Sequence, residues 1–188
     1  MEEISGSYGD CGNACDLTLD PNTAHTQLKL SKGNKGTECV KDHQPYPDHP
    51  ERFERFEQAL CQPSLTERDY WEVQFEGWAH IAVAYKGINR KEGSDCRFGL
   101  NDKSWNLYCC DNIYSVWHNK VRKNISVPSP SPKRIGVYLD WPTGTLSFYS
   151  ISDTHTLTHL HTFNTTFTEP LYAGIAVYCG YSMSLCQI

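Results

Sequence analysis

Cysteine and histidine are the residues of this chain whose chemistry could support catalysis or metal binding. The 188 residues include nine cysteines and eight histidines. His155, His159 and His161 alternate along the sequence, so on a β-strand all three would project from one face. Zinc needs three or four converging ligands that are themselves held in orientation. No carboxylate accompanies these histidines in a recognisable pattern, so a solvated histidine face is favoured over a metal site, and no cofactor is expected.

The cysteine spacing matches neither a zinc site nor a dense disulfide framework. Three residues separate Cys11 from Cys15, Cys109 and Cys110 are adjacent, and the others stand apart. Free thiols in a reducing compartment are favoured, several of them buried as small hydrophobic residues. A disulfide between Cys11 or Cys15 and another cysteine is the alternative. No local signature of Cys–His catalysis is present, and residues 33–36 lack the ending of a phosphate-binding loop.

Length and charge limit the classes of protein to consider. A chain of 188 residues is enough for one large β domain or two small ones. The net charge of −5 gives no basic footprint for nucleic acid, and the basic residues at 120–123 and 133–134 are interpreted as solvated turn or edge residues, with a contact to RNA or an acidic partner as the alternative. No run approaches the ~20 apolar residues of a membrane span, and the first residues do not resemble a signal peptide. Sequons at Asn124 and Asn164 matter only if the protein enters the secretory path.

Hydrophobic periodicity predicts strands along most of the chain. Trp71, Val73 and Phe75 alternate with other residues across positions 70–75, the pattern of a strand with one buried face. Residues 81–85 are mostly apolar, which indicates a strand covered on both faces. Further strands are expected at residues 135–140, 145–149, 171–178 and 182–186. Pro and Gly between the first two of these predict a hairpin, and many short strands with turns between them predict an all-β sandwich.

One segment, residues 50–60, has helical spacing. Its Phe53, Phe56 and Leu60 recur at intervals of three and four, and Pro50 suits the first turn of a helix. Short helical turns are therefore expected in the N-terminal part. Alternatively, the same residues belong to the core from within an irregular connection.

Four short motifs occur in a fixed order along the chain. They are Leu19-Asp20-Pro21, Glu51-Arg52-Phe53, Trp71-Glu72-Val73 and Leu139-Asp140-Trp141, the last of which continues into residues 144–149. Each motif alone is weakly specific, but together, at these separations, they resemble the B30.2 module, also called PRY-SPRY. The last motif is usually followed by an acidic residue, and here Pro142 takes that place. This departure from the family pattern affects the expected detail of one hairpin and not the expected fold.

The resemblance implies a β-sandwich of two antiparallel sheets that binds other macromolecules through its loops. It assigns residues 1–14 to an N-terminal extension, 15–62 to the PRY part and 63–188 to the SPRY part of one B30.2 domain. The sequence is similar to fish-type B30.2 domains. Such domains form the C-termini of tripartite-motif E3 ligases, of fish NACHT/leucine-rich-repeat receptors and of stonustoxin-like pore-forming toxins.

Most of the signature residues have a structural explanation. A buried indole covers a large area, so Trp71 is expected to fill the space between the sheets, together with Leu139. Asp20 and Asp140 stand beside turns, where a carboxylate can accept backbone N–H groups. The expected structural set is Leu19, Asp20, Pro21, Trp71, Glu72, Val73, Leu139 and Asp140.

The resemblance also implies a partner-binding groove formed by variable loops at one end of the sandwich. Residues 103–110 match the family strand whose alternate residues face this groove. The expected partner-binding residues are Glu54, Trp105, Tyr108, Cys110, Tyr178 and Tyr181, with residues 89–95 and 111–114 as further loop candidates. Cys110 stands where antibody-binding members carry an aromatic residue, so antibody specificity is not expected. The alternative is that Tyr108 and Tyr178 are partly buried rim residues without a ligand.

Together these observations predict a non-catalytic module that binds a host or pathogen protein as part of an innate-immune protein. A cytoplasmic location is expected, without nucleic acid or a membrane span, and any oligomerisation would come from the parent protein. The alternative is the C-terminal assembly or target-docking domain of a stonustoxin-like toxin, which would be secreted. A third hypothesis is an enzyme. Support for it would require catalytic turnover that is lost when one cysteine or histidine is replaced and the fold stays intact.

Overall fold

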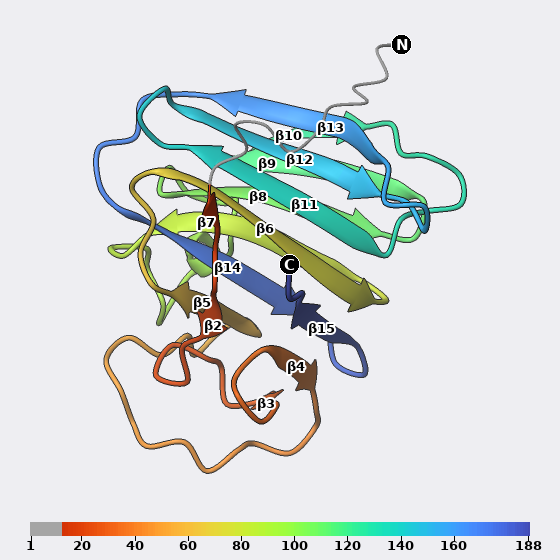
Figure 1. Ribbon diagram of the computed structural model, residues 1–188. Coiled ribbons are helices and arrows are strands. Elements are labelled where there is room, and N and C mark those ends of the chain that lie inside the picture. The colour runs from red at the N-terminus through yellow and green to blue at the C-terminus, as the bar shows by residue number, and fades with distance from the viewer. Residues whose placement is uncertain (1–12) are drawn as a thin grey trace.

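The computed structural model describes residues 13–188, which form two packed β-sheets (Figure 1). The first sheet has the strand order β13-β12-β11-β6-β15-β4-β3, and β1 pairs with β6. The second sheet has the order β10-β9-β8-β7-β14-β5-β2. All pairings except that of β1 with β6 are antiparallel, so the predicted all-β sandwich is confirmed. Cys11 lies outside the described residues.

The strands are short, and turns connect most of them. The first sheet contains β1 (Asn13–Ala14), β3 (Leu28–Leu30), β4 (Gly36–Cys39), β6 (Arg68–Glu76), β11 (Arg134–Asp140), β12 (Thr145–Ile151), β13 (Leu157–Asn164) and β15 (Ser182–Leu185). The second sheet contains β2 (Thr18–Leu19), β5 (Gln58–Gln62), β7 (Ala79–Tyr85), β8 (Ser104–Cys110), β9 (Ile113–His118), β10 (Val121–Ile125) and β14 (Leu171–Val177). The basic residues Arg122 and Lys123 lie on β10, at the edge of the second sheet, as expected.

The main core lies between the two sheets. Trp71, Val73 and Phe75 of β6 are all at most 4% exposed, as the alternation of that segment predicts. In the β11–β12 hairpin Leu139 pairs with Leu146, and both are fully buried. The inner faces of the central strands therefore form a continuous apolar layer, and the burial of this layer is the main favourable term in folding.

A second, smaller core lies on the outer face of the second sheet. Ala82 and Ala84 of β7 face away from the main core and pack with Phe53, Ile88 and Phe98. The connection 86–103 folds over this face, which explains why β7 is apolar on both sides. Gly174 of β14 makes the packing possible, since a Cβ there would lie 2.7 Å from the Phe98 ring.

The helical turns predicted for residues 50–60 are wrong. One short 3-10 helix, η1 (Ser94–Cys96), is the helical element of the part of the chain that the structure describes. The side chain of Arg52 is buried and donates to the carbonyl oxygens of Pro21, Ala24 and Pro47, each at 2.7 Å. Two of these hydrogen bonds reach residues 31 and 28 positions away, and together the three hold residues 50–57 as an irregular connection that leads into β5. Tertiary contacts therefore override the helical spacing.

The prediction that His155, His159 and His161 project from one face of a strand is also wrong. His155 lies in the turn before β13, with a φ of 60°. A β-bulge then separates the other two: His161 pairs with the buried Phe148, whereas His159 pairs with the outward-facing Tyr149. His159 and His161 therefore occupy opposite faces, because a bulge adds one residue to the alternation.

Two further observations concern residues 13–188 as a whole. In this range no three His, Cys, Asp or Glu side chains are grouped so that they could hold a metal ion. None of the helical residues described here forms a segment long and apolar enough to cross a membrane.

Candidate functional site: an aromatic and cationic hollow

Two predicted site residues, Tyr108 and Tyr178, come together on the outer face of the second sheet. Tyr108 of β8 is the register partner of His80 on β7, and their rings stack at 4.5 Å with an interplanar angle of 14°. Tyr178 follows β14, and its ring centroid lies 6.3 Å from that of Tyr108. The hydroxyl of Tyr178 lies 3.1 Å from Nε2 of His80. The antiparallel pairing of three strands thus assembles the cluster.

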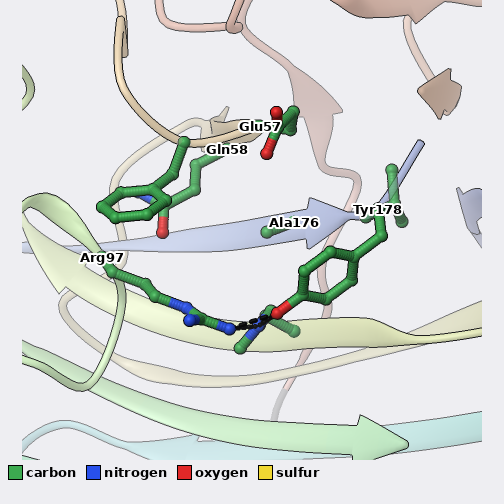
Figure 2. Close-up of a pocket in the computed structure, with 8 residues that line it drawn as sticks. Glu57, Gln58, Arg97, Ala176 and Tyr178 are labelled. Atoms are coloured by element: carbon green, nitrogen blue, oxygen red, sulfur yellow. Dashed lines mark hydrogen bonds between the residues drawn. The ribbon is translucent and has the colours of Figure 1, made fainter. Parts of the chain in front are cut away.

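Arg97 reaches this cluster from the connection between β7 and β8. Its guanidinium donates a hydrogen bond to the Tyr178 hydroxyl and lies 3.0 Å from Nε2 of His80 (Figure 2). The buried amide of Gln58 fixes both neighbours of Arg97, since Nε2 donates to the Cys96 carbonyl and Oε1 accepts the Phe98 N–H, each at 2.8 Å. The backbone at residue 97 is therefore held against β5. This also fixes the direction in which the side chain of Arg97 extends.

His80 is neutral in this network. Burial, and then the charge of Arg97, lower the pKa of His80 to about 3. Arg97 has only donors, so Nε2 of His80 must accept from it and Nδ1 must carry the proton. The side-chain amide of Asn106 lies 2.7 Å from Nδ1 and is fully buried. With its oxygen turned toward Nδ1–H, Asn106 Oδ1 gains the partner that it otherwise lacks.

The buried His80 predicts a specific pH dependence of stability. Its folded-state pKa of about 3 lies below the ordinary value, so between about pH 6 and pH 4 the unfolded chain binds one more proton at this site. The contribution to stability is fully present above that window and is lost as the pH falls, at about 1.4 kcal/mol per pH unit. We expect wild-type stability in urea to fall more steeply with acid than that of His80→Gln.

His25, whose burial also lowers its pKa, acts in the same direction and is unchanged in the variant, so the comparison isolates His80. Parallel pH profiles of the wild-type protein and His80→Gln would show that His80 is charged or exposed in the fold.

A hollow of about 100 Å³ opens beside the cluster. Its lining residues come from both the N-terminal and the C-terminal parts of the chain: they are Phe56, Glu57, Gln58, His80, Arg97, Ala176, Val177 and Tyr178. Aromatic and cationic side chains thus surround a small cavity at one end of the sheet, an arrangement suited to anchoring a group that a partner presents.

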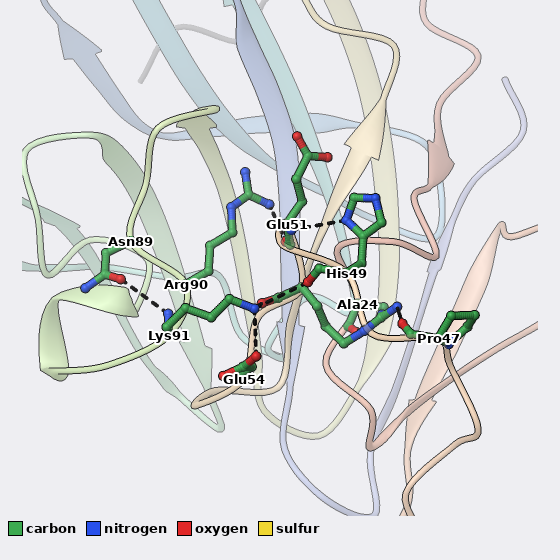
Figure 3. Close-up of polar contacts among 9 residues, drawn as sticks. Ala24, Pro47, His49, Glu51, Glu54, Asn89, Arg90 and Lys91 are labelled. Atoms are coloured by element: carbon green, nitrogen blue, oxygen red, sulfur yellow. Dashed lines mark hydrogen bonds and ion pairs between the residues drawn. The ribbon is translucent and has the colours of Figure 1, made fainter.

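Cys110, Tyr181 and Glu54, which sequence analysis also predicted, lie at the rim or beyond it. Cys110 follows Tyr108 on the same face of β8 and is partly exposed. Tyr181 belongs to the turn closed by its N–H on the Tyr178 carbonyl at 3.0 Å. Glu54 is exposed and is bound by Nζ of Lys91 at 2.7 Å, in a set of contacts that ties the connection 86–103 to the N-terminal part (Figure 3). Glu54 is not among the residues that line the hollow.

Two predicted positions, Trp105 and Tyr114, belong to the core instead. Trp105 is 3% exposed, lies on the opposite face of β8 from Tyr108 and stacks on His118 at 4.5 Å. The side chains of a strand alternate, so Trp105 cannot reach the surface on which Tyr108 lies. Tyr114, predicted within a loop, is 1% exposed on β9, and its hydroxyl donates to the Pro132 carbonyl at 2.8 Å. Only the first part of residues 111–114 is loop.

Sequence analysis missed His80, Arg97, Asn106 and Trp78. One signal was available for His80, the single polar residue of the apolar strand β7. Trp78 stands in the turn between β6 and β7 and packs edge-to-face on Tyr178 with ring centroids 5.9 Å apart. No local pattern reveals Arg97 or Asn106, because their roles depend on contacts between strands that are distant in sequence.

The buried thiols of Cys61 and Cys109 offer little nucleophilic chemistry. All eight cysteines that the structure describes are free, which agrees with the predicted free thiols for residues 13–188. Burial raises the pKa of Cys61 to about 12 and raises that of Cys109 further. A thiol must lose its proton to attack or to bind a metal, so these two residues behave as small hydrophobic side chains.

Comparisons with known proteins match nearly the whole chain. The SPRY-associated domain (PRY) model matches residues 17–65, and the SPRY domain model matches residues 68–188. The chain is 44% identical over 165 residues to stonustoxin subunit beta of Synanceia horrida, covering 87% of this chain and 23% of the toxin subunit. It is 39% identical to mouse tripartite motif-containing protein 16, covering 86% of this chain and 29% of that protein.

The solved structures agree with the sequence comparisons. The TRIM65 PSpry domain superimposes with a TM-score of 0.85 at 26% identity, covering 94% of this chain and 92% of that one. The stonustoxin structure gives a TM-score of 0.86 at 39% identity, covering 92% of this chain and 29% of the toxin chain. The chain thus spans about a quarter of the toxin subunit that it matches. The family matches, the shared two-sheet fold and the order of the motifs together place this chain in the PRY-SPRY (B30.2) family of protein-interaction modules.

Proposed function

We propose that this domain is a non-catalytic recognition module that binds a protein partner at the hollow and rim formed by Tyr108, Tyr178, His80 and Arg97. One observation carries the proposal: the side chains of Tyr108, Tyr178 and Arg97 are only partly buried, yet they rest on a buried framework formed by His80, Gln58 and Asn106. Tyrosine and arginine are over-represented among residues that dominate binding energy, and little ordering is needed when they are held in advance.

The position of the site favours a role in partner recognition over a purely structural role. The hollow lies where the irregular N-terminal connection, the 86–103 connection and the turn after β14 meet. Connections can vary in sequence while the two sheets stay constant, so such a position can be adapted to different partners. The pairing of Lys91 with Glu54 and with the carbonyl of Arg52 keeps two of these connections together (Figure 3).

Two parent proteins are compatible with the proposal. In the first, which we favour, the domain is the recognition part of a cytoplasmic innate-immune protein, and similarity to tripartite motif-containing protein 16 supports it. In the second it is the C-terminal assembly or docking domain of a secreted toxin, supported by 44% identity to stonustoxin subunit beta. The complete coding sequence distinguishes the two, since only the toxin parent would carry a pore-forming segment.

Tyr108→Ala tests the proposed site. We expect the variant to weaken partner binding by about tenfold or more, because truncating an anchor aromatic at an interface costs about 2 kcal/mol. Thermal stability should change little, since Tyr108 is partly exposed and belongs to neither hydrophobic core. Proteins retained from host and infected-cell lysates by the wild-type domain identify the partner, and titration calorimetry then gives both affinities.

Tyr149→Ala is the matched control, because Tyr149 is a partly exposed tyrosine on β12 of the other sheet. Equal loss of binding in both variants would argue against the site. Melting of the domain by Tyr108→Ala would instead assign Tyr108 to the core.

A further inference from the structure

We propose that the hollow beside Arg97 receives the carboxylate of an aspartate or glutamate side chain from the partner protein. This inference rests on the proposed function, because it assigns the chemistry of the group that the same site binds. It goes further in naming Arg97 as the residue that determines specificity.

The charge of Arg97 is not neutralised within the described part of the chain. Seven ion pairs join side chains of residues 13–188, and none includes Arg97. Its hydrogen-bond partners are the Tyr178 hydroxyl and a neutral imidazole, and its guanidinium lies 5.9 Å from the ring centroids of both Phe56 and Tyr178. All of these partners are uncharged, so a carboxylate from outside would meet a cation that is partly withdrawn from water and unpaired.

The other titratable residues that line the hollow do not cancel the positive charge of Arg97 on its side of the hollow. His80 carries no charge because burial and Arg97 lower its pKa. Glu57 is the acidic residue of the lining, and it takes part in none of the seven ion pairs of residues 13–188. Its charge acts instead on His25 and Cys39, in the N-terminal part. Figure 2 shows Glu57 across the hollow from the contact between Arg97 and Tyr178.

The shape of the hollow limits the group that it can accept. A volume of about 100 Å³ holds a few water molecules, and therefore a short side chain but not a large ring system. The planar guanidinium presents paired donors that match the two oxygens of a carboxylate. The hydrogen bonds of Gln58 to both neighbours of Arg97 fix the backbone from which the guanidinium extends, so little reorganisation is needed on binding.

Selection from a displayed library of small proteins with one randomised loop tests the inference directly. Binders are selected on the wild-type domain, and those that lose binding to Tyr108→Ala are kept as directed to the site. We expect these binders to share an Asp or Glu at one loop position. Their affinity should fall at least tenfold for Arg97→Gln and rise a few-fold for Glu57→Gln, because the first removes the attracting charge and the second removes a repelling one.

Two controls keep a folding defect from being mistaken for lost recognition. Arg97→Lys retains the charge without the planar pair of donors and should give an intermediate affinity, and thermal unfolding is measured for every variant. Independently of any change to the domain, replacing the shared acidic residue of a binder by its amide should weaken binding to the wild-type domain to a similar extent.

Each outcome decides the inference. Site-directed binders with no shared acidic residue, or with an acidic residue whose replacement is harmless, would overturn it and leave the recognition function standing. Failure to obtain any binder that depends on Tyr108 would overturn both the inference and the proposed site.

Discussion

Trp71→Ala is expected to lower the free energy of unfolding by about 3–5 kcal/mol, because it leaves a cavity in the main core. Trp71 is 3% exposed and lies on β6, which pairs with β11 and β15 in the middle of the first sheet. Domains of this kind are typically stable by ~5–15 kcal/mol, so a loss of this size removes a large part of the total. Urea unfolding followed by circular dichroism measures it.

Trp78→Ala is the matched control for this loss. Trp78 is a partly exposed tryptophan in the turn that leads into β7, and it contacts the rings of Tyr178 and Tyr181 from outside the core. Its replacement should cost much less than that of Trp71. If the two variants unfolded at the same urea concentration, Trp71 would not occupy the centre of the core.

Arg52→Met is expected to destabilise the domain by about 2–3 kcal/mol. The guanidinium is buried and supplies hydrogen bonds to three backbone carbonyl oxygens. The bond to Ala24 is buried, and a buried acceptor left without a donor costs about 1–3 kcal/mol, whereas water can partly replace the bonds to Pro21 and Pro47. Methionine keeps most of the apolar stem, so the loss reports the hydrogen bonds. These bonds hold the loops around Pro21, Ala24 and Pro47 in the N-terminal part, and their loss should loosen it first.

Arg55→Met provides the comparison, because Arg55 is an exposed arginine three residues further on that lies over the Phe56 ring at 5.6 Å. Urea unfolding of the two variants should differ clearly, and amide hydrogen exchange in residues 17–53 should increase in Arg52→Met alone. Equal stability of Arg52→Met and the wild-type protein would mean that water replaces the guanidinium at all three carbonyls.

The sheets could be predicted from the sequence because their signals are local. Alternation at Trp71, Val73 and Phe75 identifies one buried face, and the register of Leu139 with Leu146 follows from a tight hairpin between two apolar segments. The mostly apolar segment 81–85 correctly indicates cover on both faces. It could not show that Phe53 and Phe98 supply part of that cover, since neither residue is near it in sequence.

The site was harder to predict because its geometry depends on long-range contacts. The family resemblance assigned both Tyr108 and Trp105 to the groove, although the alternation of side chains along a strand puts the two residues on opposite faces. A bulge cannot be seen in sequence, so His159 and His161 were expected on one face. Arg97 becomes meaningful only when Tyr178, more than eighty positions away, is folded against it.

Amide hydrogen exchange of the domain with and without its retained protein partner tests the central claim most directly. We predict that partner binding slows amide exchange in β8, in residues 96–98 and in the turn that contains Tyr178 and Tyr181. The exchange of the backbone amides of β12 and β13 should not change. Protection confined to β12 and β13 would contradict the account, because the partner would then contact the opposite sheet and leave the hollow beside Arg97 free.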